Sequence, residues 1–389
     1  MSSTSPRKGS KPFQRTPPKI LERNDLPSLA KYMKSGKCKN VVLMLGAGVS
    51  TSAGIPDFRS PGTGLYANLS RLNLPYPEAV FEINFFKSNP VPFYTLANEL
   101  YPGRFRPTPT HSFIRLLDQQ NLLSLCLTQN IDTLERRAGV PEEKIVEAHG
   151  SFATQRCVTC KKEFDSDKMK EIVWNFEKEK KIPKCDCGGL VKPDIVFFGE
   201  QLPPAFFSSV PKVMEADLLI VIGTSLTVHP FASLAMRVHP YLCPRVLINL
   251  DQVGDFGTEQ NDVILLGKCD DVVQELCREL GWEDELNQLW EETKNSLEVR
   301  EGSEKEEQAG KSAESEVDEL AKKLALEMAL SDVTKGIEDK QSETLSSHEK
   351  ENKGVHADKK SDVDTEQAAC SETDSVTKEE PAQSSDQKP

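Results

Sequence analysis

The chain has 389 residues, of which 37% are hydrophobic, so its length allows one large α/β domain while its low hydrophobic share predicts that part of it does not fold. Residues 283–389 hold 30 acidic and 14 basic residues, which leaves 31 and 34 for residues 1–282 and gives charges of −16 and +3. We find no apolar run of about 18 residues, no secretory leader and no basic patch, which argues against a membrane span, secretion and direct nucleic-acid binding.

The ten cysteines, four of them clustered, suit a reducing compartment better than a disulfide framework. Residues 1–22 contain Pro6, Pro12, Pro17 and Pro18, which would break the amphipathic helix of a mitochondrial presequence. We therefore expect a disordered N-terminus at 1–22. The cysteine usage and the broken presequence favour a cytoplasmic over a mitochondrial protein, and we expect the nucleus as a second compartment.

A helix and a buried strand open the folded part. Leu26, Leu29 and Met33 recur at helical spacing, and the apolar run 41–45 is typical of a parallel strand buried on both faces. The Gly46-Ala47-Gly48 turn that follows lets the backbone bend sharply and approach a ligand. Ser50, Thr51 and Ser52 come next, and such residues start helices whose N–H groups bind phosphate, which indicates a dinucleotide site.

This turn departs from the dehydrogenase fingerprint. Thr51 stands where G-x-G-x-x-G has its third glycine, and no strand with an acidic end follows about 20 residues later. A nucleotide fold without hydride transfer is the better interpretation. A purely structural turn is the alternative for the two glycines. The acid, aromatic and base of Asp57-Phe58-Arg59 favour a functional loop.

Further elements alternate along the chain. Residues 60–109 hold eight prolines and several aromatics, which predicts short helices and loops that cover a ligand or pack a core. Helices are expected at 111–120 and 272–280. Apolar runs predict strands at 122–127 and 144–148 and within 217–225, 245–251 and 262–270. Strands alternating with helices predict a doubly wound parallel sheet.

Polar side chains follow two of these strands. Gln129, Asn130 and Asp132 come directly after the strand 122–127, and His149 follows the strand 144–148. Ligands of open α/β sheets bind at the carboxyl ends of the strands. A lone histidine is most often structural, but at this edge His149 is a candidate general acid or base.

Four cysteines in two pairs predict a metal site. Cys157 and Cys160 form a C-x-x-C pair, and Cys185 and Cys187 form a shorter C-x-C pair followed by glycines. Four thiolates indicate a tetrahedral structural Zn²⁺ site, with a weak site lacking one of the later cysteines as the alternative.

Two segments predict partner contacts. The apolar residues 195–197, as an unpaired edge, could add a peptide strand. In the acidic tail, residues 315–331 carry an apolar helical face for a partner or for the core, although an isolated transient helix fits equally well. The rest of the tail is expected to be disordered.

Together these motifs resemble the sirtuin family of NAD-dependent protein-lysine deacylases. The resemblance rests on GAGVSTSAGIPDFRS at 46–60, TQNIDTLE at 128–135, EAHGS at 147–151, the cysteine pairs, KPDIVFFGE at 192–200, GTSLTVHPFA at 223–232 and NLD at 249–251. It runs in order from about residue 38 to 282. The sequence is most similar to the branch of the cytosolic tubulin and histone deacetylases and their mitochondrial relative.

The resemblance implies one deacylase domain at 23–290, with a Rossmann-like lobe, a helical insertion at 60–109, a zinc lobe at about 151–192, and an acidic tail at 291–389. It implies NAD contacts from Gly46, Ala47, Gly48, Val49, Ser50, Thr51, Asp57, Phe58, Arg59, Gln129, Asn130, Ile131, Asp132, Gly223, Thr224, Ser225, Asn249, Leu250, Asp251 and Cys269. It also implies substrate contacts from Val196, Phe197, Phe198, Gly199 and Glu200.

The implied reaction expels nicotinamide from NAD and transfers the acyl group of a protein lysine to ADP-ribose, a transferase reaction. His149 would be the base, Asn130 and Asp132 would line the nicotinamide pocket, and Ile55 and Phe58 would shield it. Histones, tubulin or other cytosolic and nuclear proteins would be the substrates, with acetyl or longer acyl groups, and a further partner is conceivable for the tail. A mono-ADP-ribosyltransferase using the same cleft and a non-catalytic NAD-sensing scaffold remain the alternatives.

Overall fold

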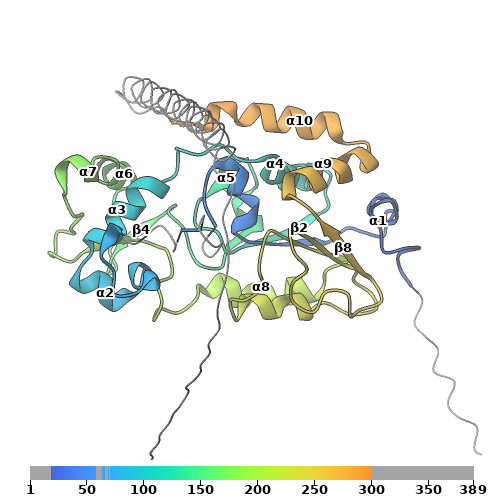
Figure 1. Ribbon diagram of the computed structural model, residues 1–389, viewed down its shortest axis with the longest axis horizontal. Helices are drawn as coiled ribbons and strands as arrows, with labels where there is room; N and C mark the ends of the chain where they lie inside the picture. The colour runs from blue at the N-terminus through green and yellow to red at the C-terminus, as the bar shows by residue number, and fades with distance from the viewer. Residues whose placement is uncertain (1–18, 58–63, 66–68, 70, 299–389) are drawn as a thin grey trace, which may run out of the picture. The chain divides into compact units, whose positions relative to one another are not determined.

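The computed structural model describes residues 19–57, 64, 65, 69 and 71–298 (Figure 1). Phe58, Arg59 and the helix predicted at 315–331 lie outside this part of the chain. None of the helices in the described ranges is long and apolar enough to cross a membrane.

A six-stranded parallel sheet forms the centre of the larger lobe, as the sequence predicts. Its strand order is β3-β2-β1-β6-β7-β8, with every neighbouring pair parallel. The strands are β1 (Val41–Leu45), β2 (Leu123–Thr128), β3 (Ile145–Glu147), β6 (Leu218–Ile222), β7 (Arg245–Asn249) and β8 (Asp262–Leu266). The order runs outward from β1 in both directions, so the loops after β1 and β6 meet at the middle of the sheet.

Helices cover both faces of this sheet because successive strand residues point to opposite sides. Leu43 and Leu45 pack with α1, α4, α9 and α10, whereas Val42 and Met44 pack with α8 and η6. Figure 1 shows α4, α9 and α10 on one side and α8 on the other. The bounds are α1 (Leu26–Met33), α4 (Pro109–Gln119), α5 (Leu134–Arg137), α8 (Pro204–Met214), η6 (Phe231–Met236), α9 (Cys269–Leu280) and α10 (Glu283–Glu292).

A second, smaller lobe has its own core of aromatic side chains. Phe86, Phe93, Tyr94 and Phe197 are almost fully buried in it, so the core-packing interpretation of the aromatic residues holds. This lobe contains η4 (Pro77–Phe81), α2 (Ile83–Ser88), α3 (Val91–Leu100), α6 (Ser166–Trp174), α7 (Phe176–Glu179) and the antiparallel pair β4 (Gln155–Cys157) and β5 (Val191–Pro193).

The packed chain reaches past both predicted ends of the domain. Leu21 is 1% exposed and belongs to the core of the larger lobe. After α10, the short helix η7 (Thr293–Ser296) leads to Glu298, whose N–H donates to the Gly103 carbonyl at 2.9 Å. The Glu298 carboxylate also pairs with Arg137 and Lys170, so the segment after α10 contacts both lobes.

Candidate active site

The turn after β1 is held against the turn after β6. The Gly48 N–H donates to the Gly223 carbonyl at 2.8 Å. A Cβ at Gly46 would lie 2.6 Å from the Thr224 Cβ, and one at Gly48 would lie 2.7 Å from the Gly223 Cα. Glycine is therefore required at both positions because the two backbones cross closely there. This supports the structural role that the sequence suggested as the alternative for the two glycines.

The chain after this turn differs from the predicted helix start. It forms two single turns of 3₁₀-helix, η1 (Ala47–Val49) and η2 (Thr51–Ala53), and the Ser50 side chain, between them, makes no capping hydrogen bond to η2. Instead the Ser50 hydroxyl donates to Asp132 Oδ2 at 2.7 Å. The serine thus joins the ends of β1 and β2.

A cleft of about 1200 Å³ lies at the carboxyl edge of the sheet. It brings together most of the residues predicted from the sequence, from the loops after all six strands. These residues are Gly46, Ala47, Gly48, Thr51, Asp57, Gln129, Asn130, Ile131, His149, Val196, Phe198, Gly223, Thr224, Ser225, Asn249, Leu250, Asp251 and Cys269.

Other predicted residues lie elsewhere. Val49 is buried in the core below the cleft, and Phe197 is 1% exposed inside the aromatic core, so neither side chain reaches a ligand there. Gly199 and Glu200 are not among the lining residues. Phe58 and Arg59 lie outside the described residues.

Ser52 and Ile195, from segments predicted to bind a ligand, also line the cleft. Several lining residues were not predicted: Phe81, Thr227, Val228, His229, Val253, Lys268, Asp270 and Asp271. Lys268, Asp270 and Asp271 could have been found, because they are polar and follow β8 as Asn130 follows β2. Phe81 carries no such signal, since its place depends on how the smaller lobe packs.

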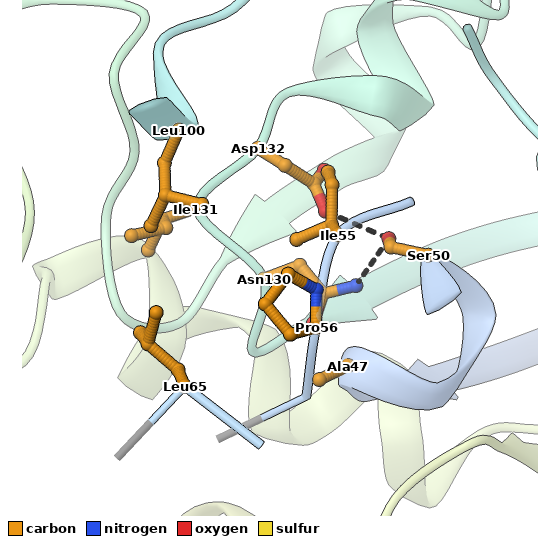
Figure 2. A pocket seen from close by; sticks show the side chains of 9 residues that line it. All are labelled: Ala47, Ser50, Ile55, Pro56, Leu65, Leu100, Asn130, Ile131 and Asp132. Carbon is orange, nitrogen blue, oxygen red and sulfur yellow. Dashed lines mark hydrogen bonds between the residues drawn. The ribbon is translucent and has the colours of Figure 1, made fainter. Parts of the chain in front are cut away.

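A narrow cavity of about 30 Å³ adjoins the cleft and shares Ala47, Asn130 and Ile131 with it (Figure 2). The Asn130 amide N–H₂ donates to Ser50 Oγ at 3.3 Å and to the Gly46 carbonyl at 3.2 Å. Because Ser50 in turn donates to Asp132, three polar side chains are fixed in one network. The rest of the wall is apolar, from Ile55, Pro56, Leu65, Leu100 and Ile131.

His149 lies half-buried in the cleft at the end of β3. Its Nδ1 is 3.1 Å from the Gln129 carbonyl, which can only accept, so Nδ1 carries the proton and Nε2 is the basic nitrogen. Burial lowers the pKa of His149, and the bond to Gln129 opposes this only in part. The ring is therefore neutral at pH 7 and able to accept a proton.

The segment after β5 is not the unpaired edge that the sequence predicts. The N–H groups of Val196, Phe197 and Phe198 donate to the His149 carbonyl, the Glu200 carboxylate and the Phe81 carbonyl. Buried Lys192 donates to the Ile195 carbonyl and pairs with Glu200 at 3.1 Å. The loop is thus held from inside, and a peptide strand cannot bind those three N–H groups.

The four predicted cysteines converge at one point of the smaller lobe. Their Sγ atoms all lie within 4.8 Å of one another, with Cys157–Cys187 at 3.5 Å and Cys160–Cys185 at 3.6 Å. Tetrahedral Zn–S bonds of about 2.3 Å require Sγ separations of about 3.8 Å, so the set fits Zn²⁺. A closed shell of four thiolates leaves no open position, and the ion would stabilise the lobe.

The short C-x-C spacing is accommodated by the glycines that follow it. Gly188 has φ +82°, a conformation that other residues rarely adopt. A Cβ at Gly189 would lie 2.7 Å from Cys157 Sγ. The second pair therefore turns tightly enough to bring both thiols to the first pair.

Comparison with known proteins adds an independent finding. The model of the Sir2 family matches residues 46–230. The NAD-dependent protein deacetylase sirtuin-2 of Danio rerio is 49% identical over 325 residues, which cover 78% of this chain and 84% of that protein. The NAD-dependent protein deacetylase hst2-1 of Emericella nidulans is 53% identical over 288 residues, 74% and 79% of the two chains. For NAD-dependent protein deacetylase sirtuin-3 of Mus musculus the identity is 48% over 275 residues, 70% and 81% of the two chains.

Proposed function

The chain belongs to the Sir2 family, and from this premise we propose that it removes acetyl groups from protein lysines in an NAD-dependent reaction centred on His149. His149 and the loops after β1, β2, β6 and β7 line one cleft, and this observation supports the roles that we propose for the residues. Acetyl-lysine proteins are the substrates, the acetyl group passes to ADP-ribose, and one water molecule is consumed as the free lysine amine is released.

NAD, when bound, supplies a ribose carbon that becomes electrophilic as nicotinamide leaves and that the acyl oxygen of the lysine attacks. Asn130 and Asp132 would hold the carboxamide of nicotinamide, in the network that Ser50 fixes. The apolar wall of Ile55 and Ile131 keeps water from the reacting carbon. The cavity of about 30 Å³ holds little more than one water molecule, so it has to widen to admit the ring.

His149 acts as the general base. The Gln129 carbonyl accepts the Nδ1–H of His149, which leaves Nε2 free to accept a proton. Nε2 would take the proton of a ribose hydroxyl, and the hydroxyl oxygen could then attack the acyl carbon of the lysine that is bonded to the ribose. A neutral imidazole is required for this step, and burial keeps His149 neutral at pH 7.

The substrate lies against Val196 and Phe198, whose side chains line the cleft. Since their N–H groups already have partners, side-chain contacts and carbonyl oxygens hold the peptide. Histones, tubulin and other cytosolic and nuclear proteins are the substrates we propose, with longer acyl groups as further ones, and the cytoplasm and nucleus are the compartments.

Mass spectrometry of an acetyl-lysine peptide incubated with the enzyme, with and without NAD, tests this function. We expect NAD-dependent loss of the acetyl group together with nicotinamide and O-acetyl-ADP-ribose, and no turnover by His149→Ala, which should still bind NAD. ADP-ribosylated protein instead of free lysine would support the transferase alternative. NAD binding without any turnover by the unmodified chain would support the scaffold alternative.

A further inference from the structure

A second group of buried polar side chains lies behind Asp132, outside the cleft. It contains His111 from α4 and Glu135 from the first turn of α5. His111 is 0% and Glu135 1% exposed, and one ligating atom of each lies within 4.8 Å of an Asp132 oxygen and of the other. Figure 2 shows Asp132 with its carboxylate toward Ser50, so Asp132 stands between the nicotinamide network and this group.

Two buried atoms of the group have no hydrogen-bond partner among the described residues: His111 Nε2 and Glu135 Oε1. His111 Nδ1 accepts the Thr108 N–H at 3.2 Å, so the ring proton sits on Nε2. Asp132 accepts hydrogen bonds at both oxygens, from Ser50 and from the Leu134 N–H at 2.9 Å. Native proteins rarely leave buried polar atoms without partners unless they have a function.

The charges that act on Glu135 are negative. Burial and the carboxylates of Asp132 and Glu147 raise its pKa to about 8, and hydrogen bonds from the Thr128 hydroxyl and its own N–H oppose this only in part. The titratable groups around the cluster are His111 on α4, Asp132 on the loop, Cys126 on β2, Glu147 on β3, paired with Arg136, and Asp270 at the start of α9. Arg136 pairs with Glu147, and none of the other groups named here is a cation that would neutralise an ionised Glu135 beside Asp132.

We propose that Glu135 is a positioning residue for the nicotinamide pocket: packed with His111, it supports Asp132 from behind and keeps the Ser50–Asn130–Asp132 network in place. This inference rests on the proposed function, because it assigns Asp132 to the nicotinamide carboxamide. When Glu135 loses its proton, two buried carboxylates repel each other. Asp132 then shifts, and the pocket binds nicotinamide less well.

Inhibition of deacetylation by added nicotinamide, measured from pH 7 to pH 9, tests the proposal. We expect the half-inhibitory concentration of the wild type to rise at least about fivefold over this range. Glu135→Gln, which keeps the shape without the charge, should change less than twofold. Glu142→Gln removes an exposed acid that also pairs with Arg136 and should follow the wild type. A flat wild-type profile, or a Glu135→Gln profile that rises with it, overturns the proposal.

Thermal unfolding without NAD separates this inference from the proposed function. Burial raises the pKa of Glu135 in the folded chain to about 8, from its ordinary pKa of 4.5. Its stabilising contribution is therefore complete below pH 4.5 and is lost as the pH rises to about 8. The difference in melting temperature, Glu135→Gln minus wild type, should increase from pH 4.5 to about pH 8 and stay constant above that. A difference that does not vary with pH contradicts the inference, whereas an absence of deacetylation contradicts only the function.

Discussion

At the scale of single residues, the protonation of His149 decides the acid limit of the reaction. Burial lowers the pKa of this ring below its ordinary 6.5, so the basic form is present at neutral pH and disappears only when the pH falls through the lowered value. We expect kcat/KM for an acetyl-lysine peptide to decline on acidification with a midpoint below 6.5. His239→Asn, which changes an exposed histidine, should leave the profile unchanged. A midpoint above 6.5 would count against His149 as the base.

Gly150 tests how tightly the backbone beside His149 is packed. A Cβ at this position would lie 1.8 Å from the Asp194 carbonyl oxygen, which belongs to the backbone and cannot turn away. Gly36 has a similar φ, +71° against +65°, but nothing within 4 Å of its Cβ position. Gly36→Ala should therefore lower the free energy of unfolding by only about 1–2 kcal/mol, because alanine disfavours the left-handed conformation.

Gly150→Ala should cost clearly more than that, about 4 kcal/mol or more, because the Asp194 backbone has to move. Urea unfolding of both variants measures the difference. Activity should fall with it, since the Asp194 segment leads to Val196, whose N–H holds the His149 carbonyl. Equal losses in the two variants would show that Asp194 gives way at little cost.

At the scale of elements, the zinc lobe provides the sharpest test. Cys187→Ser removes one thiolate, and we expect the zinc content to fall from about one ion per chain to nearly none. Hydrogen exchange should then speed up in β4 and β5, which carry Cys157 and lead to the substrate loop. Asp186→Asn changes the exposed residue between two ligands and should keep the ion. Full zinc retention by Cys187→Ser would mean that three cysteines suffice.

The strands were predictable because each buried run has the length and the continuous apolar character of a parallel strand. The observed bounds of β1 equal the predicted ones, and those of β2 and β3 lie within one residue of them. A strand that is buried on both faces is apolar at every position, so an uninterrupted apolar run of this length marks it in the sequence. The loops at their ends were predictable for the same reason, since parallel strands end at one edge.

What the sequence could not reveal depends on contacts between distant segments. The N–H groups of residues 196–198 are taken by His149, Glu200 and Phe81, a pattern that no local rule contains. The role of Gly46 and Gly48 depends on β6, far along the chain. Helix α10 was missed because its acidic first turn resembles the tail, although Leu286 and Leu289 mark its buried face.

At the scale of the whole molecule, the described chain after α9 closes the larger lobe. Leu286 is 0% exposed against α4 and α9, and the Trp290 indole N–H donates to the Pro107 carbonyl at 3.0 Å. Arg106 lies 4.2 Å above the Trp290 ring. The packed residues therefore include the described chain up to Glu298, and with it part of the acidic segment, which composition alone would assign to the tail.

Two truncated chains test this boundary. A chain ending at Glu298 keeps α10 and its contacts, and we expect it to unfold at the temperature of the full chain and to retain deacetylation. A chain ending at Trp282 exposes the core that Leu286 and Leu289 cover, at about 1.5–3 kcal/mol for each buried leucine. Its free energy of unfolding should drop by about 3–6 kcal/mol, measured by urea unfolding at pH 7. Leu286→Ala in the full chain should lose about 2–5 kcal/mol by the same mechanism. If the two truncated chains unfold alike, α10 contributes nothing to the fold and the domain ends at α9.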